Sequence, residues 1–244
     1  MKRIKQIGAL LFLVIIQACN NDDDTVTLEV LNIKYEQSTF EIGFLEEGQT
    51  LVPVVDWLGE KGTFSASSLT SDEVDLVDSS VFIDSETGVL SWNNFLPLGE
   101  SKITISASNQ FGIGMTEITI NNEFNGRFGF FTGGFNNDTS DDPFISGFDN
   151  DVLLQLRNDG IVTLLSEFDS TVIGDGLWAS EGNEIIVVYT HIDYPGEDLV
   201  MKGVLVHEIN SDPPIVFSGL WGKGLDENDN MEELMGAFSF NDSL

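Results

Sequence analysis

The sequence predicts an all-β protein built from two successive units. Short runs with apolar residues at every second position recur along the chain, and clusters of Asn, Asp, Ser and Gly separate them. This alternation is typical of strands with one buried and one wet face. The chain contains 18 Phe and 24 Gly, a combination that suits short packed strands joined by tight turns. With 41% hydrophobic residues, its 244 residues can fill substantial cores.

Residues 1–18 are typical of a cleavable secretion signal. Lys2, Arg3 and Lys5 precede an apolar run from Ile7 to Ile16. That run of about ten residues is too short to span a membrane, which takes about twenty. We therefore predict a signal peptide over residues 1–18.

The signal ends in Ile16-Gln17-Ala18-Cys19, which resembles the lipobox of bacterial lipoproteins. In that motif a small residue precedes the cysteine that becomes acylated, so the resemblance implies a lipid anchor on Cys19. The alternative is an unmodified thiol within an ordinary signal peptide. Cys19 is the only cysteine, so no intramolecular disulfide can form.

Residues 19–25 are predicted to be a lipidated acidic tether. The run from Asn20 to Asp24 cannot bury itself and must stay extended in water. It resembles the surface-export signal of Bacteroidota lipoproteins, which implies an outer-membrane protein exposed at the cell surface. A simple polar spacer on a periplasm-facing lipoprotein is the alternative.

The first folded unit is predicted over residues 26–122. The runs Lys102–Ser108 and Thr116–Ile120 alternate apolar and polar residues, and Asn109 to Gly112 offer a turn between them. Upstream, Val81–Trp92 holds two strand-like pieces around a turn rich in Asp, Ser and Gly.

Two segments of this unit, Ile83–Trp92 and Gly99–Asn109, resemble motifs of the cadherin-like and putative-Ig modules of bacterial surface proteins. The resemblance implies an Ig-like β-sandwich of seven strands with Greek-key connections. It supplies no ligand site, because the calcium-binding carboxylates of cadherin repeats are not all recognisable.

The second unit is predicted over residues 125–244. Alternating aromatic and glycine residues from Gly126 to Phe135 suit a curved strand, and Asn158-Asp159-Gly160 between apolar runs predicts a hairpin. Seven or eight hairpin-connected strands follow, which predicts an up-and-down β-barrel or, alternatively, a second sandwich. The pattern resembles the small lipocalin-like β-barrels found behind Ig-like modules in Bacteroidota lipoproteins.

The charge of the chain excludes one class of partner. Asp and Glu number 41 against 10 Lys and Arg, which gives a formal charge of −31. Such a surplus repels phosphate backbones, so we expect no nucleic-acid partner.

One acidic segment offers a candidate metal site. Asp226, Asn228 and Asp229 fall within the Asp-x-Asn-Asp-Asn string that cadherins use to bind calcium, and calcium prefers hard oxygen ligands. Chance in an acidic chain is the competing interpretation, because no further repeat follows. A loop containing Asp138, Asp141 and Asp142 is a second conceivable cation site, against the alternative of a solvated hairpin tip.

The sequence lacks the usual motifs of enzymes. It has no Gly-x-Ser-x-Gly elbow and no His-Glu-x-x-His, and His191 and His207 alone cannot complete a zinc site. We therefore predict no catalytic residue and no cofactor other than possible calcium. The four tryptophans, Trp57, Trp92, Trp178 and Trp221, are predicted to pack in cores rather than to stack on sugars.

These patterns predict a non-enzymatic, lipid-anchored surface lipoprotein. The membrane is its partner through the lipid, an Ig-like spacer follows, and a β-barrel binds an unknown ligand, glycan or protein. One alternative is a calcium-assisted adhesive protein. A second is a small surface glycan hydrolase, since 41 acidic residues leave too many carboxylate pairs to rank.

Overall fold

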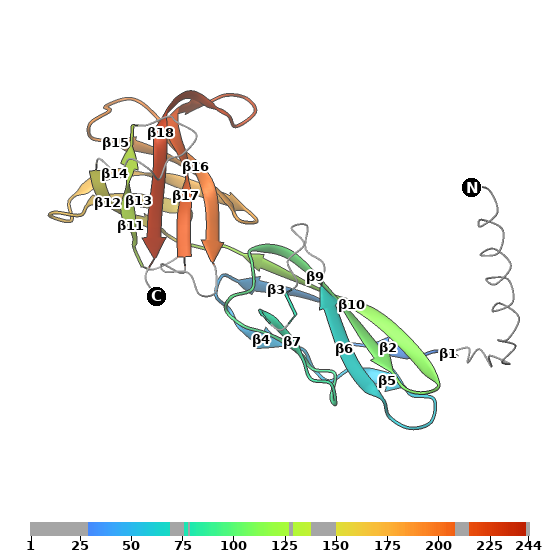
Figure 1. Ribbon diagram of the computed structural model, residues 1–244. Helices are drawn as coiled ribbons and strands as arrows, with labels where there is room; N and C mark the ends of the chain where they lie inside the picture. Colours follow the sequence, from blue (N-terminus) through green and yellow to red (C-terminus); the bar gives the residue numbers. More distant parts are fainter. Residues whose placement is uncertain are drawn as a thin grey trace, which may run out of the picture.

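The computed structural model describes residues 29–68, 76–77, 79–126, 129–137, 150–207 and 215–242. The predicted signal, Cys19, the tether and the Asp138, Asp141 and Asp142 loop lie outside these residues. The described part of the chain is all-β, as predicted, and forms two units, which Figure 1 shows one after the other. In that part no helix has the length and apolarity to cross a membrane.

The first unit is organised around one five-stranded sheet. Its strands are β1 (Glu29–Val30), β3 (Thr39–Gly43), β6 (Thr63–Ser68), β9 (Gly99–Ser108) and β10 (Gly112–Glu123). The neighbours β9 and β10 form the hairpin that the sequence predicts, with Ile103 opposite Ile118 and both side chains buried. Strands β1 and β3 pair with β10 in parallel, which local patterns did not predict.

Two smaller sheets share the core of the first unit. One joins β2 (Asn32–Lys34) to β5 (Val54–Asp56), and the other joins β4 (Gly48–Gln49), β8 (Leu90–Trp92) and β7 (Val81–Ile83) in that order. Between β7 and β8, the Asp84 carboxylate accepts the Glu86 and Thr87 amides at 2.8 and 2.9 Å. The predicted turn is therefore confirmed. Leu90 and Trp92 contribute to the same buried cluster as Ile103 and Ile118.

The second unit is a closed, eight-stranded antiparallel β-barrel. Its strands are β11 (Phe131–Asn136), β12 (Asn150–Leu156), β13 (Ile161–Ser166), β14 (Val172–Glu181), β15 (Glu184–His191), β16 (Leu199–His207), β17 (Ile215–Leu225) and β18 (Met231–Asp242). Each strand pairs with the next, and β18 pairs with β11 to close the ring. Closure removes the sheet edges and shows that the barrel, not a second open sandwich, is the correct fold for this unit.

A close backbone contact explains one of the two glycines in β11. A Cβ atom at Gly133 would lie 2.0 Å from the Ser239 carbonyl oxygen on the neighbouring β18. Only a residue without a side chain fits there, because the backbone of β18 approaches so closely. The curvature of β11 stays a prediction.

Aromatic side chains fill much of the barrel interior. Phe217, Phe238 and Phe240 are fully buried, with ring centroids 4.8 Å apart for Phe217 and Phe238 and 5.7 Å apart for Phe238 and Phe240. This packing gives the barrel a hydrophobic core of its own, separate from that of the first unit.

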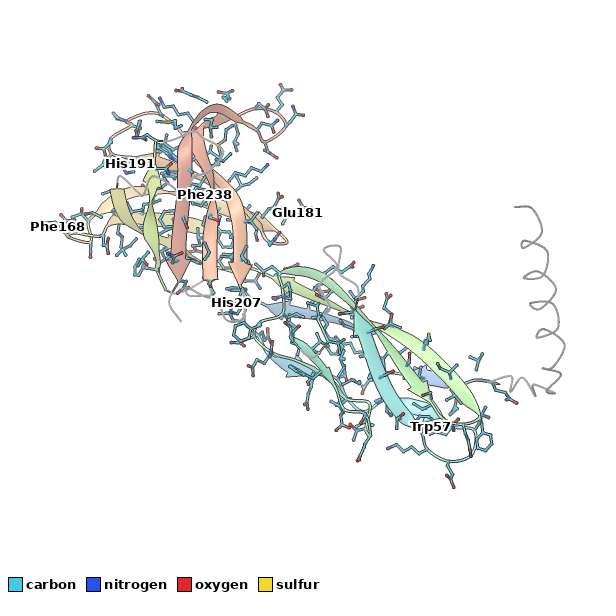
Figure 2. All side chains as sticks on the ribbon, in the orientation of Figure 1. Trp57, Phe168, Glu181, His191, His207 and Phe238 are labelled. Carbon is cyan, nitrogen blue, oxygen red and sulfur yellow. The ribbon has the colours of Figure 1, made fainter. Side chains whose placement is uncertain are left out.

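One end of the barrel contacts the first unit. Phe124, just after β10, packs against Phe44 of the first unit and Trp178 of the barrel, at centroid distances of 5.5 and 5.2 Å. The Ser180 hydroxyl donates to the Phe124 carbonyl oxygen at 3.2 Å. Figure 2 shows His207 at this junction and His191 at the opposite end of the barrel, which we call the far end.

Candidate functional site

A cavity of about 280 Å³ lies at the far end of the barrel. Strands β11, β13 and β15 end here, and β12, β14 and β16 begin here, so the rim comes from their last and first residues. The described residues that line it are Phe135, Asn137, Val152, Ser166, Ile173, Tyr189, His191, Ile192, Asp193, Tyr194, Leu199 and Trp221. Most are apolar or aromatic, as is typical of pockets for small molecules.

Four aromatic rings line the cavity and contact one another. The Phe135 and Trp221 centroids are 5.4 Å apart with planes at 67°, and those of Tyr194 and Trp221 are 6.3 Å apart at 68°. Tyr189 lies nearly parallel to Phe135, at 6.5 Å and 24°. The Trp221 indole Nε1 donates to the Asn136 carbonyl oxygen at 2.7 Å, which fixes its orientation.

Tyr189 brings a hydroxyl group into this aromatic lining. The residue is only 2% exposed, and its hydroxyl forms no hydrogen bond with the part of the chain that the structure describes. Burial raises the pKa of the Tyr189 phenol, so it stays protonated at neutral pH. The hydroxyl oxygen is not among the buried side-chain atoms that lack a partner, so it is open to the cavity and available to a ligand or to water.

His191 is the cavity's histidine. Its Nδ1 accepts the Asp193 amide at 3.2 Å, which places the proton of the neutral ring on Nε2. Burial lowers the pKa of His191, and the Asp193 carboxylate, 3.7 Å from Nδ1, opposes that shift only in part. The imidazole is therefore neutral at pH 7.

Acidic groups outnumber basic ones around the cavity. Among the described lining residues Asp193 is the only carboxylate, and there is no Lys or Arg. Lys223 lies beside the cavity, with Nζ 5.7 Å from the Tyr194 ring centroid. Its charge is paired with Glu197 at 2.7 Å and Glu233 at 3.9 Å.

The candidate calcium ligands lie in the turn between β17 and β18. The Asp226 carboxylate accepts the amides of Asn228 at 2.8 Å and Asn230 at 2.9 Å, and these bonds hold its pKa below the usual range. Asp229 adopts a positive φ of 58°. Within the described residues no three His, Cys, Asp or Glu side chains are grouped as a metal site would need. The calcium assignment to Asp226, Asn228 and Asp229 stays a prediction.

The other residues that the sequence singled out are dispersed. His191 and His207 lie at opposite ends of the barrel, so they form no shared site (Figure 2). Trp92 is buried, and Trp57 and Trp178 are partly buried against the two cores, in agreement with the predicted packing roles. Trp221 is buried as well, but it also lines the cavity.

Sequence reasoning did not predict the cavity. The sequence suggested core packing for Trp221 and no zinc site for His191, and it gave no reason to single out Tyr189 or Tyr194. One signal was available in β15. Ile185, Val187 and Tyr189 are alternate residues that all point into the barrel, and the last of them carries a hydroxyl group where the first two are apolar.

Comparisons with known proteins give little guidance. No protein-family model matches the chain, and no curated protein matches its sequence. Among solved structures, a quinoprotein alcohol dehydrogenase-like protein from Bacteroides thetaiotaomicron is similar over 85% of this chain and 72% of that one. The identity is 7% and the TM-score 0.30, and we draw no argument from so weak a similarity.

Proposed function

We propose that this chain is a non-enzymatic, lipid-anchored outer-membrane lipoprotein whose barrel binds a small molecule at its far end. In this account the lipid on Cys19 holds the chain at the membrane. The first unit is a cadherin-like, Ig-like spacer, and the barrel is the binding module exposed at the cell surface.

The observation that carries the proposal is the far-end cavity with its unpaired hydroxyl. The cavity is lined by Phe135, Tyr194 and Trp221, and the Tyr189 hydroxyl is left without a described partner. Apolar walls with a few polar groups are the usual composition of a ligand pocket. The first unit contacts the opposite end of the barrel, near His207, so it leaves this cavity uncovered.

The fold assignments within this proposal rest on sheet arrangement. Eight antiparallel strands closed into one barrel are the architecture in which lipocalins hold a single small ligand. The five-stranded sheet and the two smaller sheets around one core support the Ig-like assignment of the first unit.

The glycan-hydrolase alternative gains no support from the cavity. Glycoside hydrolysis needs two carboxyl groups on either side of the scissile bond. Asp193 is the only carboxylate among the described lining residues. We therefore favour binding over catalysis.

Cavity-filling substitution tests the binding function. Thermal unfolding of the full chain is measured with a panel of neutral, cationic and anionic small molecules, and we expect at least one class to raise the unfolding temperature. Ile173→Phe, which places a larger ring in the cavity wall, should weaken that response. Leu177→Phe, on the same strand but 65% exposed and outside the cavity, should preserve it. A panel without any response, or an unchanged response in Ile173→Phe, would contradict the proposal.

The anchor has a separate test. In cells that process lipoproteins, the wild-type chain should fractionate with the outer membrane, and Cys19→Ala should not. Mass spectrometry of the wild-type protein should find the chain beginning at an acylated Cys19. An unmodified thiol, or equal membrane association of both proteins, would contradict the anchor.

A further inference from the structure

Crossed aromatic planes line the cavity. Trp221 meets Phe135 and Tyr194 edge to face, at 67° and 68°, and all three rings belong to the cavity lining. The face of an aromatic ring is electron-rich and attracts cations. The Tyr194 ring already holds a cation in this way: the Lys223 ammonium lies 5.7 Å from its centroid.

The far end of the barrel is strongly acidic. Three of its loops, residues 167–171, 192–198 and 226–230, carry two, three and three acidic residues and no Lys or Arg. The charge of Lys223 is balanced by its two glutamate partners, and His191 is neutral at pH 7. The resulting field attracts cations to the cavity and repels anions.

The polar side chains of the described lining are mostly uncharged: Asn137, Ser166, Tyr189 and Tyr194 offer amide or hydroxyl oxygens. Asp193 is the only carboxylate among the described lining residues, and its side chain is 76% exposed, so it stays hydrated at the rim. On entering the cavity a primary ammonium must replace three hydrogen bonds to water, and no buried carboxylate is among the described lining residues to pair with its charge. A fully alkylated ammonium has no N–H to satisfy and spreads its charge over methyl groups.

From this combination we infer that the cavity binds an alkylated ammonium group, of the size of the trimethylammonium head of choline. The inference rests on the proposed binding function and names its ligand class. Aromatic faces supply the attraction, as in other sites for quaternary ammonium ions. The Tyr189 hydroxyl then donates to a polar group elsewhere on the ligand. Such a head group is compatible with a cavity of about 280 Å³.

Matched probes separate charge from shape. Isothermal titration calorimetry on the full chain uses choline, its neutral analogue with a tert-butyl group in place of trimethylammonium, and the corresponding tert-butyl carboxylate. The first two have nearly the same shape and differ in charge. We expect choline to bind about tenfold more tightly than the neutral analogue and the carboxylate to bind most weakly.

Two variants locate the effect. Tyr194→Leu keeps an apolar side chain but removes a π face, so it should weaken choline binding about tenfold and leave the neutral analogue unchanged. Phe168→Leu also removes an aromatic ring at the far end, but Phe168 is 97% exposed and lies outside the cavity. It should change neither affinity.

The outcomes distinguish this inference from the proposed function. Equal or tighter binding of the neutral analogue would overturn the ammonium inference and support a binding cavity of another preference. Absence of heat with all three probes would also overturn it. The proposed binding function is then tested by the thermal-unfolding panel of neutral, cationic and anionic small molecules and by its Ile173→Phe variant.

Discussion

The imidazole of His207 stacks on the ring of Phe95, with 4.5 Å between their centroids and 25° between their planes. His207 ends β16 in the barrel, and Phe95 lies between β8 and β9 in the first unit. Phe44, also of the first unit, meets the same imidazole nearly edge-on at 5.7 Å. Aromatic contacts therefore join the two units at the barrel end opposite the cavity.

Removing the Phe95 ring should loosen this junction. We expect Phe95→Ala to lower the free energy of unfolding by about 1–2 kcal/mol, since it loses both the stacking and part of the buried surface. Small-angle scattering should show a larger radius of gyration. Phe111→Ala, which removes a 46% exposed ring in the turn between β9 and β10, away from the junction, should leave the radius of gyration unchanged. The same radius in wild type and Phe95→Ala would show that the stack does not hold the units together.

A methyl group at Gly133 should distort the barrel. Because the added Cβ would lie 2.0 Å from the Ser239 carbonyl oxygen, β11 and β18 must separate. We expect Gly133→Ala to cost about 2 kcal/mol or more in urea denaturation. At Gly43 the nearest atoms to an added Cβ are 3.6 Å away, so Gly43→Ala is the control and should be tolerated. Equal stability of the two variants would contradict the close approach.

Local sequence patterns were sufficient to predict the hairpins. Asn158-Asp159-Gly160 predicted the β12–β13 turn, where Gly160 adopts a φ of +78°. The alternation around Ile103 and Ile118 predicted that these two runs form a hairpin, as β9 and β10 do. Both features depend on residues close in sequence, which is why local periodicity and turn chemistry can predict them.

Long-range pairings were beyond such patterns. The barrel closes where Gly133 pairs with Phe240, and β3 joins the first sheet where Thr39 pairs with Thr119. Nothing local specifies these partners. The cavity depends on the same closure, because Phe135 and Trp221 meet only once β11 and β18 have paired. The acidic residues near Asp226 are neighbours in the sequence and could be recognised there. The aromatic residues of the cavity come from different strands and could not.

The Asp226 carboxylate should stabilise the β17–β18 turn. Asp226→Ala removes the acceptor of two amides and should lower the unfolding temperature, whereas Asp226→Asn retains one acceptor oxygen and should lie between. The folded pKa of Asp226 is below its usual 3.8, so this contribution is present at neutral pH and is lost as the pH falls through the folded value. Identical melting of all three proteins at pH 7 would refute the role.

The same variants test the calcium prediction. If calcium binds through Asp226, Asn228 and Asp229, millimolar calcium should raise the unfolding temperature of the wild-type chain and leave Asp226→Ala unaffected. A wild-type melting curve that is the same in calcium and in chelator would remove this segment as a calcium site.

Acid should destabilise the barrel through His191. Its pKa is lowered in the folded state, so the unfolded chain binds more protons as the pH falls below about 6.5. The wild type should therefore lose more stability between pH 7 and pH 5 than His191→Gln, which cannot titrate there. Urea denaturation of both proteins at the two pH values measures the difference. Equal losses would show that burial of His191 does not depress its pKa.

The location of the bound ligand is the most direct test of the account. In a backbone-amide NMR titration of the full chain with choline, we predict shifts concentrated at residues 189–194 and around Phe135 and Trp221, with the amides near His207 unmoved. Shifts clustered at the His207 end or in the first unit, or no shifts at saturating choline, would contradict it.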